Sequence, residues 1–148
     1  MSKRNPLPFS TTLEVRDACL CLHVQRAARA LARSFDEILR PLGLTSGQFS
    51  LMMSLNRAEP PRIGQVSAVL AMDRTTLTAN LKPLVRRGLV TVAVDEADRR
   101  SRRLALTPAG RSLLAAALPL WERAQAENRQ RIAGSGLERL LADLRALS

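Results

Sequence analysis

The segment 72–110 constrains the fold more than any other part of this chain, because it predicts a helix and a β-hairpin in direct succession. Asp73 is placed to cap the helix, three leucines repeat behind it at helical spacing, and Gly88 is placed to end it. Alternating residues over 90–94 predict a half-buried strand, and two leucines over 104–106 mark its return partner. The local pattern therefore fixes a helix, a strand, a turn and a second strand in order.

Short polar and basic side chains crowd this helix and the turn of this hairpin. A helix followed by a basic hairpin is the arrangement with which a winged helix-turn-helix occupies a major groove and an adjacent minor groove. We therefore predict double-stranded DNA as the partner. The candidate DNA-binding residues are Arg74, Thr75, Thr76, Thr78, Asn80, Lys82 and Arg86 on the helix, and Asp98, Arg99, Arg100 and Arg102 in the turn, where Arg103 also lies near Asp98.

The charge of the chain favours a polyanionic partner. Its 148 residues include 23 Lys and Arg against 13 Asp and Glu, a net charge of +10. The segment 73–111 holds nine basic and four acidic residues, so its balance of +5 is half of the excess. Basic side chains that neutralise phosphates release condensed counterions. Charge alone would also fit an RNA-binding or membrane-surface protein, but its concentration on the predicted helix and hairpin favours DNA.

Helices on both sides of this region are predicted to form a homodimer. Apolar or small residues recur every three or four positions from Cys21 to Leu42, which is typical of a helix that packs on a helical partner. We predict a mainly α fold with a small β-hairpin wing: a winged helix region at 45–110 and dimerisation helices at 13–42 and 111–148. A dimer would present two DNA-reading helices to a palindromic operator, about one DNA turn apart.

The sequence gives little to support catalysis or a membrane location. No apolar run approaches the roughly 20 residues of a membrane span, and the first residues have no apolar signal region. One histidine, no glycine-rich phosphate loop and no metal-ligand spacing predict neither an enzyme nor a cofactor or metal site. Cys19 and Cys21 point about 200° apart on one predicted helix, which disfavours a disulfide and indicates a reduced, cytoplasmic protein.

Three stretches resemble the MarR family of transcriptional regulators: LGLTSGQF at 42–49, DRTTLTANLKPLVRRGLV at 73–90 and DEADRRSRRLALTPAG at 95–110. The resemblance extends over about 13–147. It implies a homodimeric repressor released by a small ligand or an oxidant, in which Arg100 enters the minor groove and Asp98 braces it. The chain departs from the family at Ala79, where many members have a basic residue, and after Leu89, where an arginine is often found.

A narrower resemblance concerns the peroxide-sensing OhrR branch. Cys21 lies 21 residues before Leu42, which is the spacing of the reactive cysteine in that branch. That branch hydrogen-bonds its cysteine with tyrosines, at positions that match Gln25 and Phe35 here, and this chain contains no Tyr. Two interpretations stay open: Cys21 is a redox sensor for an organic hydroperoxide, or it is a small buried residue of the apolar stripe.

Two further alternatives remain at this point. Many members of the family admit small aromatic ligands to a cleft between the dimer helices and the winged region. By resemblance, the candidates near such a cleft are His23, Phe35, Arg40 and Met52. The alternative to a regulator is a winged-helix module that acts through protein contacts and binds nucleic acid only non-specifically.

Overall fold

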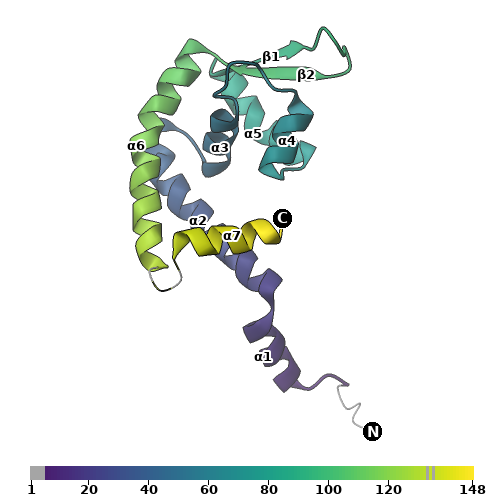
Figure 1. The fold of residues 1–148 in the computed structure, drawn as a ribbon, viewed down its shortest axis with the longest axis vertical. Helices are drawn as coiled ribbons and strands as arrows, with labels where there is room; N and C mark the ends of the chain where they lie inside the picture. Colours follow the sequence, from purple (N-terminus) through teal and green to yellow (C-terminus); the bar gives the residue numbers. More distant parts are fainter. Residues whose placement is uncertain (1–5, 133, 135) are drawn as a thin grey trace.

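The computed structural model describes residues 6–132, 134 and 136–148 of the chain, and its elements are mainly helical (Figure 1). In chain order the elements are α1 (Phe9–Ala18), α2 (Leu20–Leu39), the 3-10 helix η1 (Arg40–Leu42), α3 (Ser46–Ser54), α4 (Ile63–Leu70), α5 (Arg74–Arg86), β1 (Val90–Val94), β2 (Arg102–Leu106), α6 (Pro108–Arg131) and α7 (Leu137–Ala146). This arrangement confirms the predicted fold class. None of the helices in the described residues is both long enough and apolar enough to span a membrane.

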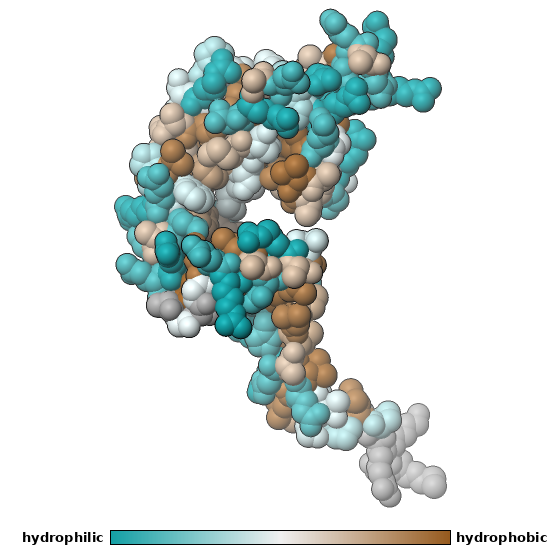
Figure 2. All heavy atoms as spheres, in the orientation of Figure 1, coloured by the Kyte–Doolittle hydropathy of each residue, from teal (hydrophilic) through white to brown (hydrophobic). Residues whose placement is uncertain are grey.

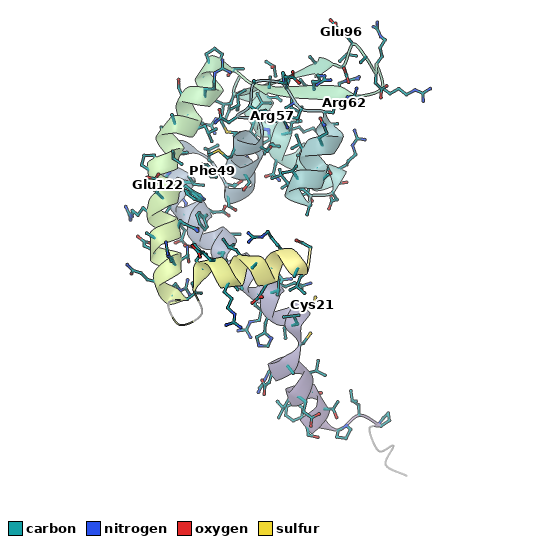
Figure 3. The ribbon with its side chains drawn as sticks, viewed as in Figure 1. Cys21, Phe49, Arg57, Arg62, Glu96 and Glu122 are labelled. Atoms are coloured by element: carbon teal, nitrogen blue, oxygen red, sulfur yellow. The ribbon has the colours of Figure 1, made fainter. Side chains whose placement is uncertain are left out.

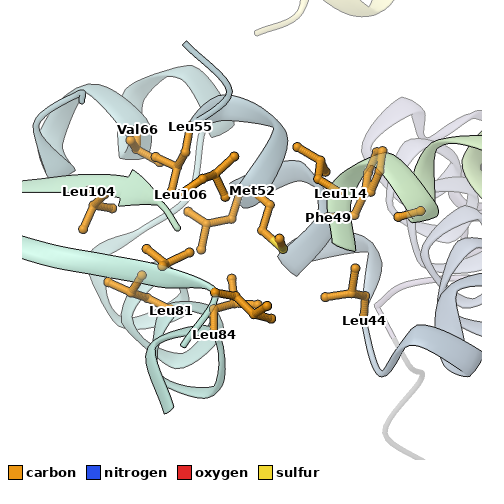
Figure 4. Packing of buried hydrophobic residues seen from close by; sticks show 14 of the residues in the cluster. Leu44, Phe49, Met52, Leu55, Val66, Leu81, Leu84, Leu104, Leu106 and Leu114 are labelled. Atoms are coloured by element: carbon orange, nitrogen blue, oxygen red, sulfur yellow. The ribbon is translucent and has the colours of Figure 1, made fainter. Parts of the chain in front are cut away.

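The winged lobe contains α3, α4, α5 and the antiparallel hairpin of β1 and β2. Leu77, Leu81 and Leu84 of α5 are buried as their spacing predicts, and they pack with leucines of α3 and β2 (Figure 4). Side chains cap the starts of α3 and α6. The Thr45 and Gln48 side chains form a capping box at α3, and the Thr107 side chain accepts from the Gly110 N–H at the start of α6.

A helical arm joins the winged lobe through α2 and α6, which lie side by side (Figure 1). The buried Asn128 of α6 donates from Nδ2 to Ser34 Oγ of α2 at 3.2 Å. Nearer the lobe, the rings of Phe49 and Trp121 stack with centroids 6.2 Å apart, which places α3 against α6. Trp121 is partly buried and packs against the hydrophobic core.

The prediction of one continuous helix over 13–42 is wrong, because the structure has two helices there. The backbone leaves the helical region at Cys19, with φ −69° and ψ 107°, so α1 and α2 are separate. Cys19 caps α2, and its Sγ accepts from the Leu22 N–H at 3.5 Å. In the single chain Cys19 is partly buried and Cys21 is exposed.

Several large apolar side chains are exposed in the single chain, including two valines of the strand that was predicted to be half-buried. Val92 and Val94 are 42% and 45% exposed, because the hairpin projects past the helices and only Val90 reaches the core. Val69 of α4 is 75% exposed and Met53 of α3 is 37% exposed. The leucines of α7 form one apolar face, but none of them is buried. The predicted end of α6 at Ala133 lies outside the described residues.

Candidate nucleic-acid interface

The first turn of α5 is fixed by Asp73. Its carboxylate accepts from the Thr76 backbone N–H at 2.7 Å and from the Thr76 hydroxyl at 3.1 Å. The backbone and side-chain hydrogen bonds from Thr76 hold the pKa of Asp73 below its ordinary value, so the cap is charged at neutral pH. Thr76 was predicted as a DNA contact, but its hydroxyl is engaged in this cap.

One face of α5 is exposed and lines a shallow hollow on the surface of the winged lobe. The residues of this hollow are Arg74, Thr75, Thr78, Ala79 and Lys82. Positions 74, 75, 78 and 82 share a helix face because they are three or four residues apart. Four of the seven helix residues predicted to bind DNA therefore lie together on an accessible surface. A neighbouring hollow between α5 and β1 adds Arg86 to this surface.

Asn80 lies on a different side of α5, which departs from the expected outward position. Its Nδ2 donates to the Thr76 carbonyl oxygen at 3.0 Å, and it also contacts Met72 Sδ at 3.7 Å. A Cβ built at Gly47 of α3 would lie only 3.0 Å from Asn80 Oδ1. The side chain therefore sits between α5 and α3, where the absence of a side chain at Gly47 makes room for it.

The wing is the turn between β1 and β2, and it extends away from the helices (Figure 1). Asp98 Oδ1 accepts from the Arg100 backbone N–H at 3.1 Å, so Asp98 shapes the turn and makes no recorded ion pair with the Arg100 guanidinium. Arg102 Nη1 donates to the carbonyl oxygens of Arg99 and Ser101 at 3.2 Å each. Arg99 and Arg100 are exposed at the tip, within the hydrophilic cluster that Figure 2 shows there.

Asp95 lies at the centre of the basic cluster, a position that the sequence interpretation had given to Asp98. Its side chain is 3% exposed and accepts from Arg62 Nε at 2.5 Å, from Arg103 Nε at 3.1 Å and from the Ala97 N–H at 3.2 Å. Burial by itself raises the pKa of Asp95, but the hydrogen bonds from Arg103, Ala97 and Arg62 outweigh it and hold the pKa below its ordinary value. This charged group ties the wing to the segment before α4.

Arg87, just after α5, has a structural role at the end of the 3-10 helix η1. Its Nη1 donates to the Gly43 carbonyl oxygen at 2.8 Å, and its Nη2 donates to the Leu42 carbonyl oxygen at 3.0 Å. These bonds satisfy carbonyl groups at the C-terminal end of η1, where a positive charge is also favoured. Arg87 therefore joins the C-terminal end of α5 to the end of η1.

Comparisons with known proteins identify the family. A family model described as the MarR family matches residues 42–101, from η1 to the wing. Transcriptional regulator HosA of Escherichia coli O111:H- is 36% identical over 97 residues, which cover 64% of this chain and 70% of HosA. The chain belongs to the MarR family. Members of this family are transcription regulators, which confirms the prediction of a non-enzymatic protein.

Two of the solved structures that resemble this MarR-family chain are complexes of regulators with DNA. M. tuberculosis transcriptional regulator MosR with DNA has a TM-score of 0.78 and 38% identity, and the match covers 87% of this chain and 92% of MosR. The repressor CouR, bound to a 23-mer DNA duplex, also has a TM-score of 0.78, with 27% identity over 90% of this chain and 94% of CouR. These likenesses support double-stranded DNA as the partner of the MarR fold described here.

An apolar hollow lies between the winged lobe and α6, and its lining residues differ from those predicted near a ligand cleft. An apolar hollow of about 530 Å³ opens between α3, α4 and α6, beside the stacked rings of Phe49 and Trp121. Its lining residues are Phe49, Ser50, Met53, Ser54, Val69, Leu70, Leu118 and Trp121. None of the four predicted residues His23, Phe35, Arg40 and Met52 lines it. Met52 is fully buried, and the His23 ring is hydrogen-bonded at Nδ1 to the Cys19 carbonyl oxygen at 2.8 Å.

Proposed function

We propose that this chain is a homodimeric transcriptional repressor that binds a palindromic operator through α5 and the wing. The observation that carries the proposal is the exposed face of α5, on which Arg74, Thr75, Thr78 and Lys82 line one hollow beside a basic wing. Threonine hydroxyls donate and accept hydrogen bonds at base edges, whereas Arg and Lys neutralise phosphates. A helix with this face fits the major groove.

The wing supplies the second contact of the proposed complex. Arg100 is exposed at the tip, and Asp98 holds its backbone in the turn, so the guanidinium is presented outward. A narrow minor groove has a strong negative potential that attracts an inserted arginine. We assign Arg100 to the minor groove and Arg99, Arg102, Lys82 and Arg86 to the flanking phosphates. Thr76 and Asn80 are assigned to the support of α5, because their side chains are engaged within the lobe.

A second copy of this chain is proposed to cover the apolar faces of the helical arm. Large apolar side chains of all three helices are exposed in the single chain (Figure 2): Phe9 and Val15 of α1, Leu20 and Leu31 of α2, and Leu141 and Leu144 of α7. Exposed apolar faces of this extent on three helices are typical of a protein–protein interface. The predicted stripe from Cys21 to Leu42 would pack there, which supports a dimer with two DNA-reading helices.

Release from DNA is proposed to follow from a small ligand or an oxidant. The hollow beside Trp121 has an apolar lining with two serine hydroxyls, which suits a small aromatic molecule. For the oxidant, Cys21 is exposed and accepts from Gln25 Nε2 at 3.3 Å, so an amide stands where the peroxide-sensing branch has a tyrosine. Either agent needs only to favour a spacing of the two α5 helices that does not fit DNA.

Fluorescence anisotropy with the duplex upstream of the chain's own coding sequence tests the proposal. We expect binding much tighter than to a scrambled duplex, with a steep dependence on salt. Equal affinity for both duplexes would favour the alternative, a winged-helix module that binds proteins and only non-specific nucleic acid. Sedimentation of the free protein tests the dimer, and a monomer at the concentrations that bind DNA would contradict it.

The same titration with an organic hydroperoxide separates the two release mechanisms. Loss of binding on oxidation and recovery with a thiol, both absent in Cys21→Ser, would support a thiol sensor. Binding that is indifferent to the oxidant would leave the apolar hollow as the release site. Quenching of Trp121 fluorescence by a small aromatic compound would then report its occupation.

A further inference from the structure

The basic residue Arg62 is not among the DNA contacts proposed above. It immediately precedes α4, and its Cα lies opposite that of Arg103 in an isolated antiparallel bridge beside β2. The Leu104 N–H donates to the Pro61 carbonyl oxygen at 3.0 Å, so the segment 61–62 runs along the hairpin. Figure 3 shows Arg62 where α4 approaches the hairpin and Glu96 in the turn of the wing. Arg62 therefore belongs to the wing in space, although 33 residues separate it from Asp95.

The charges around Asp95 do not balance. One buried carboxylate accepts from two guanidinium groups, which leaves a surplus of one positive charge. Arg103 is engaged on two sides, because its Nε donates to Asp95 and its Nη1 donates to the Pro60 carbonyl oxygen at 2.7 Å. Among the described residues, the only hydrogen bond recorded for the Arg62 side chain is the one from Nε to Asp95. Neither Glu59 nor Glu96 has a recorded ion pair with it.

The side chain of Arg62 is 41% exposed, so its terminal nitrogens reach solvent while its Nε is held. A guanidinium has five N–H donors in a rigid plane, and it can bind a carboxylate on one edge and a phosphate on another. Arg62 also precedes the first helix of the helix-turn-helix pair α4 and α5. In that motif the first helix crosses the DNA backbone.

We propose that Arg62 binds a phosphate of the DNA backbone beside the wing, and that Asp95 is the positioning residue that holds its guanidinium for this contact. The inference rests on the proposed function, since it adds one contact to the same DNA surface. The buried carboxylate fixes the direction of the arginine, and the surplus charge of the cluster is available to the phosphate. A phosphate contact carries no sequence information, so it must act equally on specific and random DNA.

Arg62→Gln and Arg57→Gln form a matched pair for the test. Both substitutions remove one positive charge from the segment that joins α3 to α4, but Arg57 is exposed and has no recorded ion pair among the described residues (Figure 3). One phosphate contact changes the salt slope by about 0.9, which corresponds to about eightfold in affinity between ~0.1 M and 1 M salt. We expect Arg62→Gln to weaken specific and random duplexes by a similar factor of about eight at ~0.1 M salt. Arg57→Gln is expected to change both less than twofold.

Asp95→Asn tests the positioning role, because its effect on DNA binding should depend on whether Arg62 is present. In the natural chain it should weaken binding severalfold, whereas in the Arg62→Gln background it should add less than twofold, because the arginine that it orients is gone. Arg62→Lys keeps the charge and should restore most of the salt slope. Circular dichroism melts of each variant identify any loss of folding, and the Arg62 and Arg57 pair decides the contact even if Asp95→Asn unfolds.

Two results would overturn this proposal while leaving the proposed function intact. If the natural chain prefers its own duplex, Arg100→Ala weakens it, and Arg62→Gln behaves like Arg57→Gln, then Arg62 makes no phosphate contact. If Arg62→Gln weakens only the specific duplex, Arg62 reads sequence and the phosphate assignment is wrong. A natural chain that binds both duplexes equally contradicts the proposed repressor instead, and Arg62→Gln would still be compared on the random duplex.

Discussion

Gly110 allows the first turn of α6 to lie against the backbone of Leu89, and a methyl group at this position would remove that possibility. A Cβ built at Gly110 would lie 2.1 Å from the Leu89 carbonyl oxygen and 3.0 Å from its carbonyl carbon. Gly110 is buried, and its N–H donates to Thr107 Oγ1 at 3.0 Å. Because the obstacle is backbone, no change of rotamer can relieve the contact. Gly110→Ala therefore requires α6 to move relative to the hairpin.

The size of the effect follows from that movement. A Cβ in ordinary van der Waals contact lies 3.4–4 Å from its neighbours, so the backbone must shift by more than about 1 Å in a close-packed core. Overpacking of a core costs about 1–3 kcal/mol, and a shift of this size belongs at the upper end. The higher helix propensity of Ala returns up to about 1 kcal/mol. We expect Gly110→Ala to lower the free energy of unfolding by about 2 kcal/mol and Tm by about 4–8 °C.

Gly64→Ala is the matched control, because it makes the same chemical change in α4. A Cβ built at Gly64 meets nothing within 4 Å, and its φ is not in the left-handed region. Ala at such a position is expected to raise the free energy of unfolding by about 0.5 kcal/mol. Thermal melts followed by circular dichroism, at one protomer concentration, compare the two variants with the natural chain. A Tm for Gly110→Ala at or above that of the natural chain would refute the reasoning.

Three further predictions follow from the proposed DNA surface. Arg100→Ala should cost about 1–3 kcal/mol of DNA binding by anisotropy, and an unchanged Kd at moderate salt would contradict its groove contact. Asn80→Ala should lower Tm with little change in the Kd for DNA, whereas Thr78→Ala should raise the Kd with little change in Tm. Equal effects of the two substitutions on the Kd would contradict this distinction. The pKa of Asp95 is lowered on folding, so its stabilisation is present above the ordinary value of 3.8 and is lost as the pH falls through the folded value. The Tm difference between the natural chain and Asp95→Asn should therefore shrink on acidification, and a difference that grows would show the opposite sign.

Local signals in the sequence predicted much of this fold. The capping residues Thr45, Asp73 and Thr107 each act on an N–H three residues away, so the chain itself carries both partners of the bond. The leucines of α5 were placed correctly for the same reason, since a helix face is set by spacing alone. The break at Cys19 was missed because no Gly or Pro marks it.

Contacts between distant segments could not be predicted in the same way. Asp95 is held by Arg62 from 33 residues earlier, and a sequence pattern does not show which arginine a carboxylate will meet. Asn80 was expected to point outward, but it faces α3 because Gly47 leaves space for it. Both cases concern side chains whose partners are brought close only by the tertiary fold. The residue types were informative, but the directions of the side chains were not.

The connection between α5 and α6 links the proposed DNA surface to the apolar hollow. The Thr107 N–H donates to the Leu89 carbonyl oxygen at 3.0 Å, the Thr107 hydroxyl donates to the Gly88 carbonyl oxygen at 2.6 Å, and Gly110 packs on the same backbone. Two lining residues of the hollow, Leu118 and Trp121, are on α6. A ligand that moves α6 away from α3 must therefore strain these bonds or carry the end of α5 with it. Because packed cores shift between discrete arrangements, a displacement at Trp121 would reach α5, the proposed DNA-reading helix, through backbone contacts at Gly88 and Leu89.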